Sequence, residues 1–196
     1  MALNTALREM LAAAIALCER QAGEDSAAAL HFAGIAGQAL AAPANPDPPA
    51  PRRLPACRHL GSLQADGLAE MAKSLHWTQN PNYLSDPKMR AFVRDYAYAE
   101  LMGPGGIALG VDAALGLLLI GPQRYYPPHR HPARETYLTV AGEADWWRDG
   151  DAWRTLPAAA LVEHAPDRVH AMRTAEQALL ALYAWSGEIG TAARLV

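Results

Sequence analysis

The sequence predicts a mainly β protein in which a single antiparallel barrel follows an α-helical N-terminal region. After Gly106, short apolar runs alternate with turn signals, and this spacing is typical of antiparallel sandwiches and barrels. Before that point, apolar residues recur mostly at helical spacing. We therefore expect a helical region over residues 1–101, packed on a barrel over residues 102–196.

The helical region begins with an amphipathic segment. Its apolar positions are Leu3, Leu7, Met10, Leu11, Ala14, Ile15 and Cys18. A second helix is expected from Asp25 to about Ala41. Residues 42–55 contain six prolines, which forbid a regular element and predict an extended surface linker. Because the helices have apolar faces that need a partner, we expect them to form a cap on the barrel or a homodimer contact.

Two further helices are expected before the barrel. Ser62 is a suitable N-cap for a short helix over residues 63–73. Asp86 followed by Pro87 marks a second start, and Gly103 ends that helix. The apolar face of this second helix consists of Met89, Phe92, Val93 and Tyr96.

The barrel strands are predicted from apolar runs between turns. They are residues 107–111, 114–120, 135–140, 144–148, 152–156 and 179–185. Asp149-Gly150 is a two-residue hairpin signal between two of these runs. The tryptophans that flank it, Trp146, Trp147 and Trp153, are expected to stabilise the hairpin by cross-strand packing.

Composition limits the class of protein. The chain has 196 residues, 51% hydrophobic residues and a formal net charge of −3, so it offers no basic footprint for a nucleic acid. No apolar run approaches the roughly 18 residues that a membrane span needs. Cys18 and Cys57 form no metal or redox motif, and we interpret them as reduced thiols of a cytoplasmic protein. These features favour a small-molecule substrate, with neither nucleic acid nor membrane as partner.

A cluster of metal-ligand residue types stands out in the barrel sequence. His129, His131 and Glu135 have the spacing His-x-His-x3-Glu, and Tyr137 follows two residues later. Residues of equal parity on a strand point to one face, so Glu135 and Tyr137 should share the barrel interior. Three histidines and one carboxylate, with His170 as the fourth ligand, suit one divalent transition metal. The set does not choose between iron(II), zinc, manganese, cobalt and nickel.

The alternative to a metal centre is a degenerate, metal-free barrel. A His-x-His pair alone is commonly a surface or structural feature. A glutamate at the right offset, a closing glycine and a distant histidine favour metal binding instead. His164 also lies nearby in sequence, but outside the motif, and we expect it at the barrel rim.

The region around these residues resembles the first cupin motif. The matching positions are Gly121, His129, His131, Glu135 and Gly142, with a longer first gap than usual. The second cupin motif is degraded, because only His170 matches and Ala165, Asp167 and Thr174 replace its proline, glycine and asparagine. The resemblance implies a cupin barrel with His170 as a metal ligand.

Residues 125–137 resemble more closely the core of cupin-type dimethylsulfoniopropionate lyases. The shared features are paired tyrosines before the histidines and a tyrosine two residues after the glutamate. The resemblance implies cleavage of dimethylsulfoniopropionate to dimethyl sulfide and acrylate by β-elimination. It also implies Tyr137 as the catalytic base, with Tyr126 positioning the substrate or the metal. A core tyrosine that supports Glu135 is the alternative role for Tyr137.

A sulfonium group is attracted to aromatic faces. The aromatic residues that could bind it are Trp77, Tyr83, Tyr126 and Trp185. The ligand set also leaves other functions open: a mononuclear iron dioxygenase, a sugar isomerase, or a non-catalytic cupin that binds a small molecule.

Overall fold

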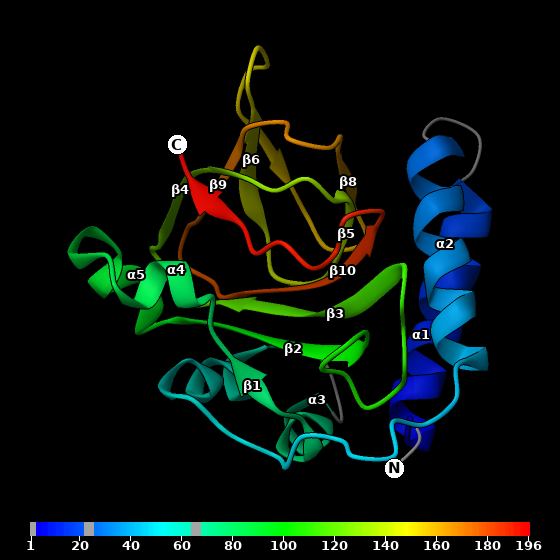
Figure 1. Cartoon of the computed structure of the whole chain (residues 1–196). Helices are drawn as coiled ribbons and strands as arrows, with labels where there is room; N and C mark the ends of the chain where they lie inside the picture. Colours follow the sequence, from blue (N-terminus) through cyan, green and yellow to red (C-terminus); the bar gives the residue numbers. More distant parts are fainter. Residues whose placement is uncertain (1–2, 22–25, 64–67) are drawn as a thin grey trace.

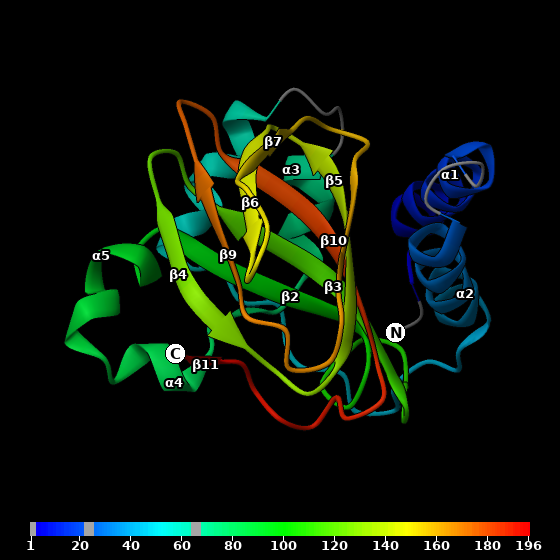
Figure 2. The same cartoon turned by 90° about the horizontal axis from the view of Figure 1, so that it is seen from above.

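Two antiparallel sheets face each other and enclose the barrel interior in the computed structural model, which describes residues 3–21, 26–63 and 68–196 (Figures 1 and 2). The larger sheet has the order β1 (Trp77–Thr78), β2 (Tyr96–Met102), β3 (Ala113–Ile120), β10 (Leu179–Ser186), β5 (Arg134–Ala141) and β8 (Leu161–His164). The smaller sheet has the order β11 (Arg194–Leu195), β4 (Tyr125–Arg130), β9 (His170–Thr174), β6 (Ala144–Arg148) and β7 (Arg154–Leu156).

Two helices, α1 (Thr5–Gln21) and α2 (Ser26–Ala41), pair beside the larger sheet (Figure 1). The side chain of Asn4 accepts a hydrogen bond from Leu7 N at 3.0 Å, which caps the start of α1. The helices continue as η1 (Pro55–Ser62), α3 (Leu68–Met71), η2 (Ala72–Ser74), α4 (Pro81–Leu84), η3 (Pro87–Met89) and α5 (Arg90–Val93). Among the helices in the described ranges, none has the length and apolar character that a bilayer crossing needs.

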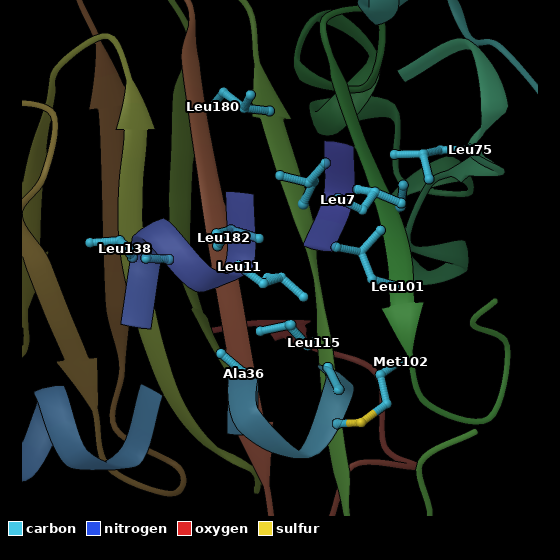
Figure 3. Packing of buried hydrophobic residues seen from close by; sticks show 14 of the residues in the cluster. Leu7, Leu11, Ala36, Leu75, Leu101, Met102, Leu115, Leu138, Leu180 and Leu182 are labelled. Atoms are coloured by element: carbon cyan, nitrogen blue, oxygen red, sulfur yellow. The ribbon is translucent and has the colours of Figure 1, made fainter. Parts of the chain in front are cut away.

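The larger sheet is buried on both faces. Its outer face packs against α1 and α2, and Figure 3 shows Leu11 of α1 beside Leu115 and Leu182 of the strands, with Leu7 beside Leu101. Burying one such leucine contributes about 1.5–3 kcal/mol, so the helix pair is held mainly by this apolar contact.

A polar contact adds to the attachment of α2. His31 Nδ1 lies 2.8 Å from Thr136 Oγ1 of β5, and His31 Nε2 lies 2.8 Å from Ser186 Oγ of β10. The single histidine therefore joins the helix to two neighbouring strands. It also shows that Thr136 points outward, as parity predicted.

The inner face of the same sheet lines the barrel. Tyr137 and Tyr183 belong to an interior cluster, whereas Leu138 and Leu182, their neighbours in sequence, belong to the outer one. This alternation follows from the period of two in a strand. The sequences of β3 and β10 are continuous apolar runs because both faces of these strands are covered.

The expected helix after Pro87 is wrong beyond Val93. Residues 96–102 form strand β2, which pairs with β3, so the barrel begins before residue 102. The segment Tyr-Ala-Tyr-Ala-Glu also alternates with period two, and pairing with a long apolar strand decides between the two patterns. Strand β2 therefore lies within residues that were expected to belong to the helical region.

Three other expectations differ from the structure. Residues 107–111 are not a strand, because backbone bonds join Ile107 and Leu109 to the linker at Asn45 and Pro43 instead. Strand β8 was not expected, since its four residues carry a weak pattern. Ser62 ends η1 and does not begin a helix, and its Oγ donates to the carbonyl of His59 at 2.7 Å. Of the helix expected over residues 63–73, residues 64–67 lie outside the described ranges, as does Asp25.

Candidate metal centre and active site

Three buried side chains converge inside the barrel. His131 follows β4, Glu135 lies on β5 and His170 begins β9, and their ligand atoms all lie within 4.8 Å of one another. Glu135 Oε2 is 3.1 Å from His131 Nε2 and 3.5 Å from His170 Nε2. Two imidazoles and one carboxylate in this arrangement are compatible with a single divalent metal ion.

Backbone carbonyls set the tautomer of the histidines. A carbonyl only accepts, so Nδ1 must be the donor in three contacts: His129 to Pro127 O at 2.8 Å, His131 to Ala133 O at 3.0 Å and His170 to Arg168 O at 2.8 Å. In the neutral rings, Nε2 therefore carries the lone pair that a metal ligand needs. The backbone of the strands and turns that carry these histidines therefore sets the orientation of their imidazoles.

The polar atoms of the cluster fit a bound cation. His170 Nε2 is buried and has no hydrogen-bond partner in the described structure, which is costly unless a further group satisfies it. Burial lowers the pKa of His170 to about 4, so this imidazole is neutral at physiological pH. Burial would also raise the pKa of Glu135, but the nearby His131 and His170 outweigh burial and lower it. The cluster thus offers a carboxylate and a free imidazole nitrogen.

His129, the first predicted ligand, lies beside this cluster but outside it. Its ring stacks on Tyr126 with centroids 3.7 Å apart and meets the edge of His170 at 4.1 Å. The pairing of β4 with β9 shifts register between Tyr126 and His129, so the side chain of His129 does not follow the regular alternation of the strand. His129 lines the cavity and remains available to complete a ligand set.

A cavity of about 200 Å³ opens onto the cluster. The predicted residues Tyr126, Tyr137 and Trp185 line it, together with His129, His131 and Glu135. Trp185 Nε1 donates a hydrogen bond to Glu135 Oε1 at 2.5 Å. Burial, and then the neighbouring Glu135 carboxylate, raise the pKa of Tyr137 well above its ordinary value. Tyr137 therefore stays protonated unless a positive charge is present.

Two of the aromatic residues predicted to contact substrate do not reach the cavity. Trp77 lies in the outer cluster, and its Nε1 donates to Ala72 O at 3.0 Å. It lies on the edge strand β1, which pairs with β2, and packs on the face away from the barrel interior. Tyr83 is buried behind the cavity wall, where its hydroxyl lies 2.9 Å from that of Tyr126. Its contact with Tyr126 makes Tyr83 a support for the wall.

His164 is not at the rim, and that expectation is wrong. It is fully buried on β8, opposite Glu135 in the strand register, and stacks on His170 with centroids 3.9 Å apart. Neither of its ring nitrogens has a partner in the described structure. It was expected at the rim because it lies outside the cupin motif, and its pairing on β8 opposite Glu135 is what places it inside.

The structure also adds cavity residues that sequence reasoning missed. They include Asn80, Tyr96, Tyr98, Glu100, Tyr183, Ile189, Gly190, Ala192 and Ala193. The alternation Tyr96, Tyr98, Glu100 on β2 was the available signal, but the segment was interpreted as helix. Trp146, expected only at the hairpin, also packs inside the barrel against Tyr137, with ring centroids 5.2 Å apart.

Comparisons with known proteins show the family of the chain. A family model described as dimethylsulfoniopropionate lyase matches residues 35–181. The dimethylsulfoniopropionate lyase DddQ of Ruegeria pomeroyi is 35% identical over 101 residues, which are 52% of this chain and 50% of that protein. The match thus spans about half the length of the curated relatives.

Solved structures extend the similarity to the fold. The crystal structure of DddQ from Ruegeria pomeroyi superposes with a TM-score of 0.71 at 25% identity, over 88% of this chain and 97% of that chain. A crystal structure of the lyases RdDddP and RnDddQII has a TM-score of 0.69 at 23% identity, over 95% of this chain and 99% of that chain. The expected cupin barrel with N-terminal helices is confirmed. Because the family model spans most of the chain, including the metal-ligand motif, this protein belongs to the dimethylsulfoniopropionate lyase family.

Proposed function

We propose that the protein is a carbon–sulfur lyase that cleaves dimethylsulfoniopropionate to dimethyl sulfide and acrylate by metal-dependent β-elimination. The observation that carries this proposal is the juxtaposition of the buried His131–Glu135–His170 cluster with Tyr137 on one aromatic cavity. Membership of the lyase family supports the same reaction. The cluster supplies a place for the substrate carboxylate, and Tyr137 supplies a base beside it.

His131, Glu135 and His170 would hold one divalent transition metal per chain, with His129 as the fourth protein ligand. The mixed nitrogen and oxygen donors suit iron(II), zinc, manganese, cobalt or nickel. When bound, the metal would polarise the substrate carboxylate and stabilise a phenolate nearby. Tyr137 needs such a positive charge to act as a base, because burial and Glu135 raise its pKa.

The proton transfer falls to Tyr137. Its phenolate oxygen would take a proton from the carbon next to the substrate carboxylate. The electrons of that C–H bond form the new double bond, and the C–S bond breaks with its electrons leaving on sulfur. The products are acrylate and neutral dimethyl sulfide, and the proton remains on the Tyr137 hydroxyl. Tyr126, stacked on His129 and hydrogen-bonded to Tyr83, would hold the substrate against the base.

The reaction is tested by mixing metal-loaded protein with dimethylsulfoniopropionate. We expect equimolar dimethyl sulfide in the headspace and acrylate in solution, both abolished by a chelator and restored by added metal. Substrate-dependent oxygen consumption without dimethyl sulfide would favour a dioxygenase instead. Tight binding of the substrate without products would favour a non-catalytic cupin.

The compartment and the oligomeric state belong to the same proposal. The thiols of Cys18 and Cys57 are free and buried, which supports a reducing, cytoplasmic compartment. Leu30 on α2 is 68% exposed, which supports a homodimer contact through the helical region. Light scattering at micromolar concentration would test the dimer, and a Leu30→Asp variant should then be monomeric.

A further inference from the structure

The cavity has two chemically different ends. One end carries His129, His131 and Glu135, and the other carries Tyr98, Glu100 and Tyr183. Glu100 and Glu135 are the two carboxylates of the lining, and none of the described lining residues is a lysine or an arginine. A ligand that fills this cavity therefore meets a second negative group away from the candidate metal cluster.

The strand register places Glu100 at this end. Along β2, Tyr96, Tyr98 and Glu100 share one face, which is the face that lines the cavity. Glu100 is opposite Gly116 of β3, Gly116 is opposite Tyr183 of β10, and Tyr183 is opposite Tyr137 of β5. One row of positions thus runs from Glu100 to the proposed base over three strand intervals, or about 14 Å of backbone.

The missing side chain of Gly116 leaves room for the ring of Tyr183. A Cβ at this position would lie 2.4 Å from Tyr183 Oη, a distance that real Cβ atoms do not tolerate. Tyr183 therefore extends across β3 toward β2, where its ring meets that of Tyr98 edge to face, with centroids 6.4 Å apart. The two tyrosines form an aromatic corner on the side of the cavity where Glu100 lies.

One oxygen of the Glu100 carboxylate is held by the backbone, and the other remains accessible. Oε1 accepts a hydrogen bond from Gly105 N at 2.6 Å, and Oε2 accepts none from the residues that the structure describes and is not among their buried unpaired atoms. Burial raises the pKa of Glu100, because a negative charge here is poorly solvated. A cation that arrives without its own water would relieve this cost and gain the attraction of the aromatic faces.

We propose that Glu100, with the rings of Tyr98 and Tyr183, is the binding site for the onium group of the substrate. This assignment rests on the proposed function and adds the residues that select a cation over a neutral group of the same shape. The substrate would lie along the row with its carboxylate toward Glu135 and His131 and its dimethylsulfonio group toward Glu100. The cation held by the metal-ligand cluster would then face the carboxylate of this short zwitterion, and Glu100 would face its positive group.

The chemistry predicts an unusual kinetic consequence. The sulfonium charge disappears as the C–S bond breaks, so Glu100 stabilises the bound substrate more than the transition state. Loss of the carboxylate should therefore raise KM without lowering kcat. Neutral dimethyl sulfide would also lose its attraction to Glu100 and leave.

The test uses Glu100→Gln, because the amide oxygen can still accept from Gly105 N. The matched control is Glu143→Gln, which changes an exposed glutamate. Calorimetry on cobalt-loaded protein compares 3-(trimethylammonio)propionate with 4,4-dimethylpentanoate, two carboxylates of the same shape that differ only in the positive charge.

We expect the wild type and the control to prefer the cationic probe, and Glu100→Gln to reduce that preference about tenfold. With dimethylsulfoniopropionate, KM should rise about tenfold while kcat does not fall. An unchanged preference, or an equal loss of affinity for both probes, would overturn the assignment. A wild type that prefers the cationic probe but releases no dimethyl sulfide would refute the proposed reaction and leave the onium site standing.

Discussion

Trp185 and Glu135 are joined by a 2.5 Å hydrogen bond from the indole Nε1 to the carboxylate Oε1. The same indole ring stacks on His131 with centroids 4.2 Å apart. Trp185 therefore contacts two members of the candidate metal cluster, and it occupies the position opposite Glu135 in the strand register. Trp185, which was predicted to bind the sulfonium, thus lines the cavity and also donates to the carboxylate of the candidate metal cluster.

Replacing Trp185 by phenylalanine keeps the ring but removes the N–H donor. We expect metal affinity to fall about tenfold, since hydrogen bonds that orient ligands typically contribute 10–100-fold. Excess metal should restore turnover. Competition with a chromogenic chelator measures the affinity, and Trp147→Phe, on the partly exposed hairpin, is the control. Equal metal affinities for Trp185→Phe and wild type would show that the bond does not support the site.

Tyr137→Phe removes only the hydroxyl that would accept the substrate proton. The rate should fall by about 10²–10⁴-fold, with unchanged metal content, because general base catalysis has that magnitude. Single-turnover kinetics and elemental analysis on the same sample check both values. If metal content falls in parallel and excess metal rescues the rate, Tyr137 supports Glu135 instead of removing the proton.

The metal ligands can be separated by three variants. His131→Ala and His170→Ala should lose most of the metal, because each removes a ligand atom from the cluster. His164→Phe should keep it, since no nitrogen of His164 belongs to that cluster, and phenylalanine can preserve the stacking on His170. Elemental analysis after dialysis measures the metal content of each variant. Metal loss in His164→Phe as large as in His170→Ala would make His164 a ligand.

The helical region is predicted to act as a cap and not as an independent domain. Removal of residues 1–41 would expose the outer leucines of the larger sheet, so the remaining fragment should aggregate. Protease should first cut full-length protein within residues 42–55. A soluble fragment with full activity would contradict the prediction.

Two leucines provide a matched test of apolar packing at the helix–sheet interface. Leu11 is completely buried, and Leu11→Ala should cost about 3 kcal/mol of unfolding free energy. Leu84 on α4 is 59% exposed, and Leu84→Ala should cost less than about 0.5 kcal/mol. Urea denaturation of both variants gives the comparison, and similar costs would argue against packing as the source of stability.

Asp95 connects η1 to the barrel and should make stability depend on pH. Its buried carboxylate contacts Arg58, His59 and Arg124. Burial acts to raise the pKa of Asp95, but these partners outweigh burial and lower it. A lowered folded-state pKa stabilises the protein above the unfolded pKa of about 3.9, and this contribution is lost as pH falls through the folded value.

Asp95→Asn should therefore cost about 2 kcal/mol near neutral pH, or roughly 6 °C in Tm. The difference from wild type should shrink as pH falls below about 4, because the carboxylate of the unfolded chain then binds a proton while the folded one stays ionised down to its lower pKa. Thermal unfolding followed from pH 3 to 7 tests both statements, with Asp112→Asn, an exposed aspartate, as control. A difference that stays constant over the whole range would mean that the charge of Asp95 does not stabilise the fold.

Local sequence pattern was sufficient to predict which faces of several helices and strands are buried. The amphipathic spacing of residues 3–18 predicted the face of α1 that packs on the sheet, because a helix buries every third or fourth residue wherever its partner lies. The parity of Glu135 and Tyr137 likewise predicted that both point into the barrel. Such inferences need only the geometry of one element.

Other features depended on partners distant in sequence. The segment 96–102 carries both a helical and a strand pattern, and its pairing with β3 decided for the strand. Burial of His164 and the distance of Trp77 from the cavity depended on which strands became neighbours. No local pattern specifies that pairing, because it is set by competition among all the strands for apolar cover.

The sequence by itself determined the residue types of the site, the barrel class and the alternation of faces within each strand. These depend on ligand chemistry and on the periods of regular structure. Tertiary structure alone decided that Trp185 holds Glu135 and that Glu100, Gly116, Tyr183 and Tyr137 form one row. The reason is that strand register, which brings residues far apart in the chain to one side of a cavity, comes from folding the two sheets together.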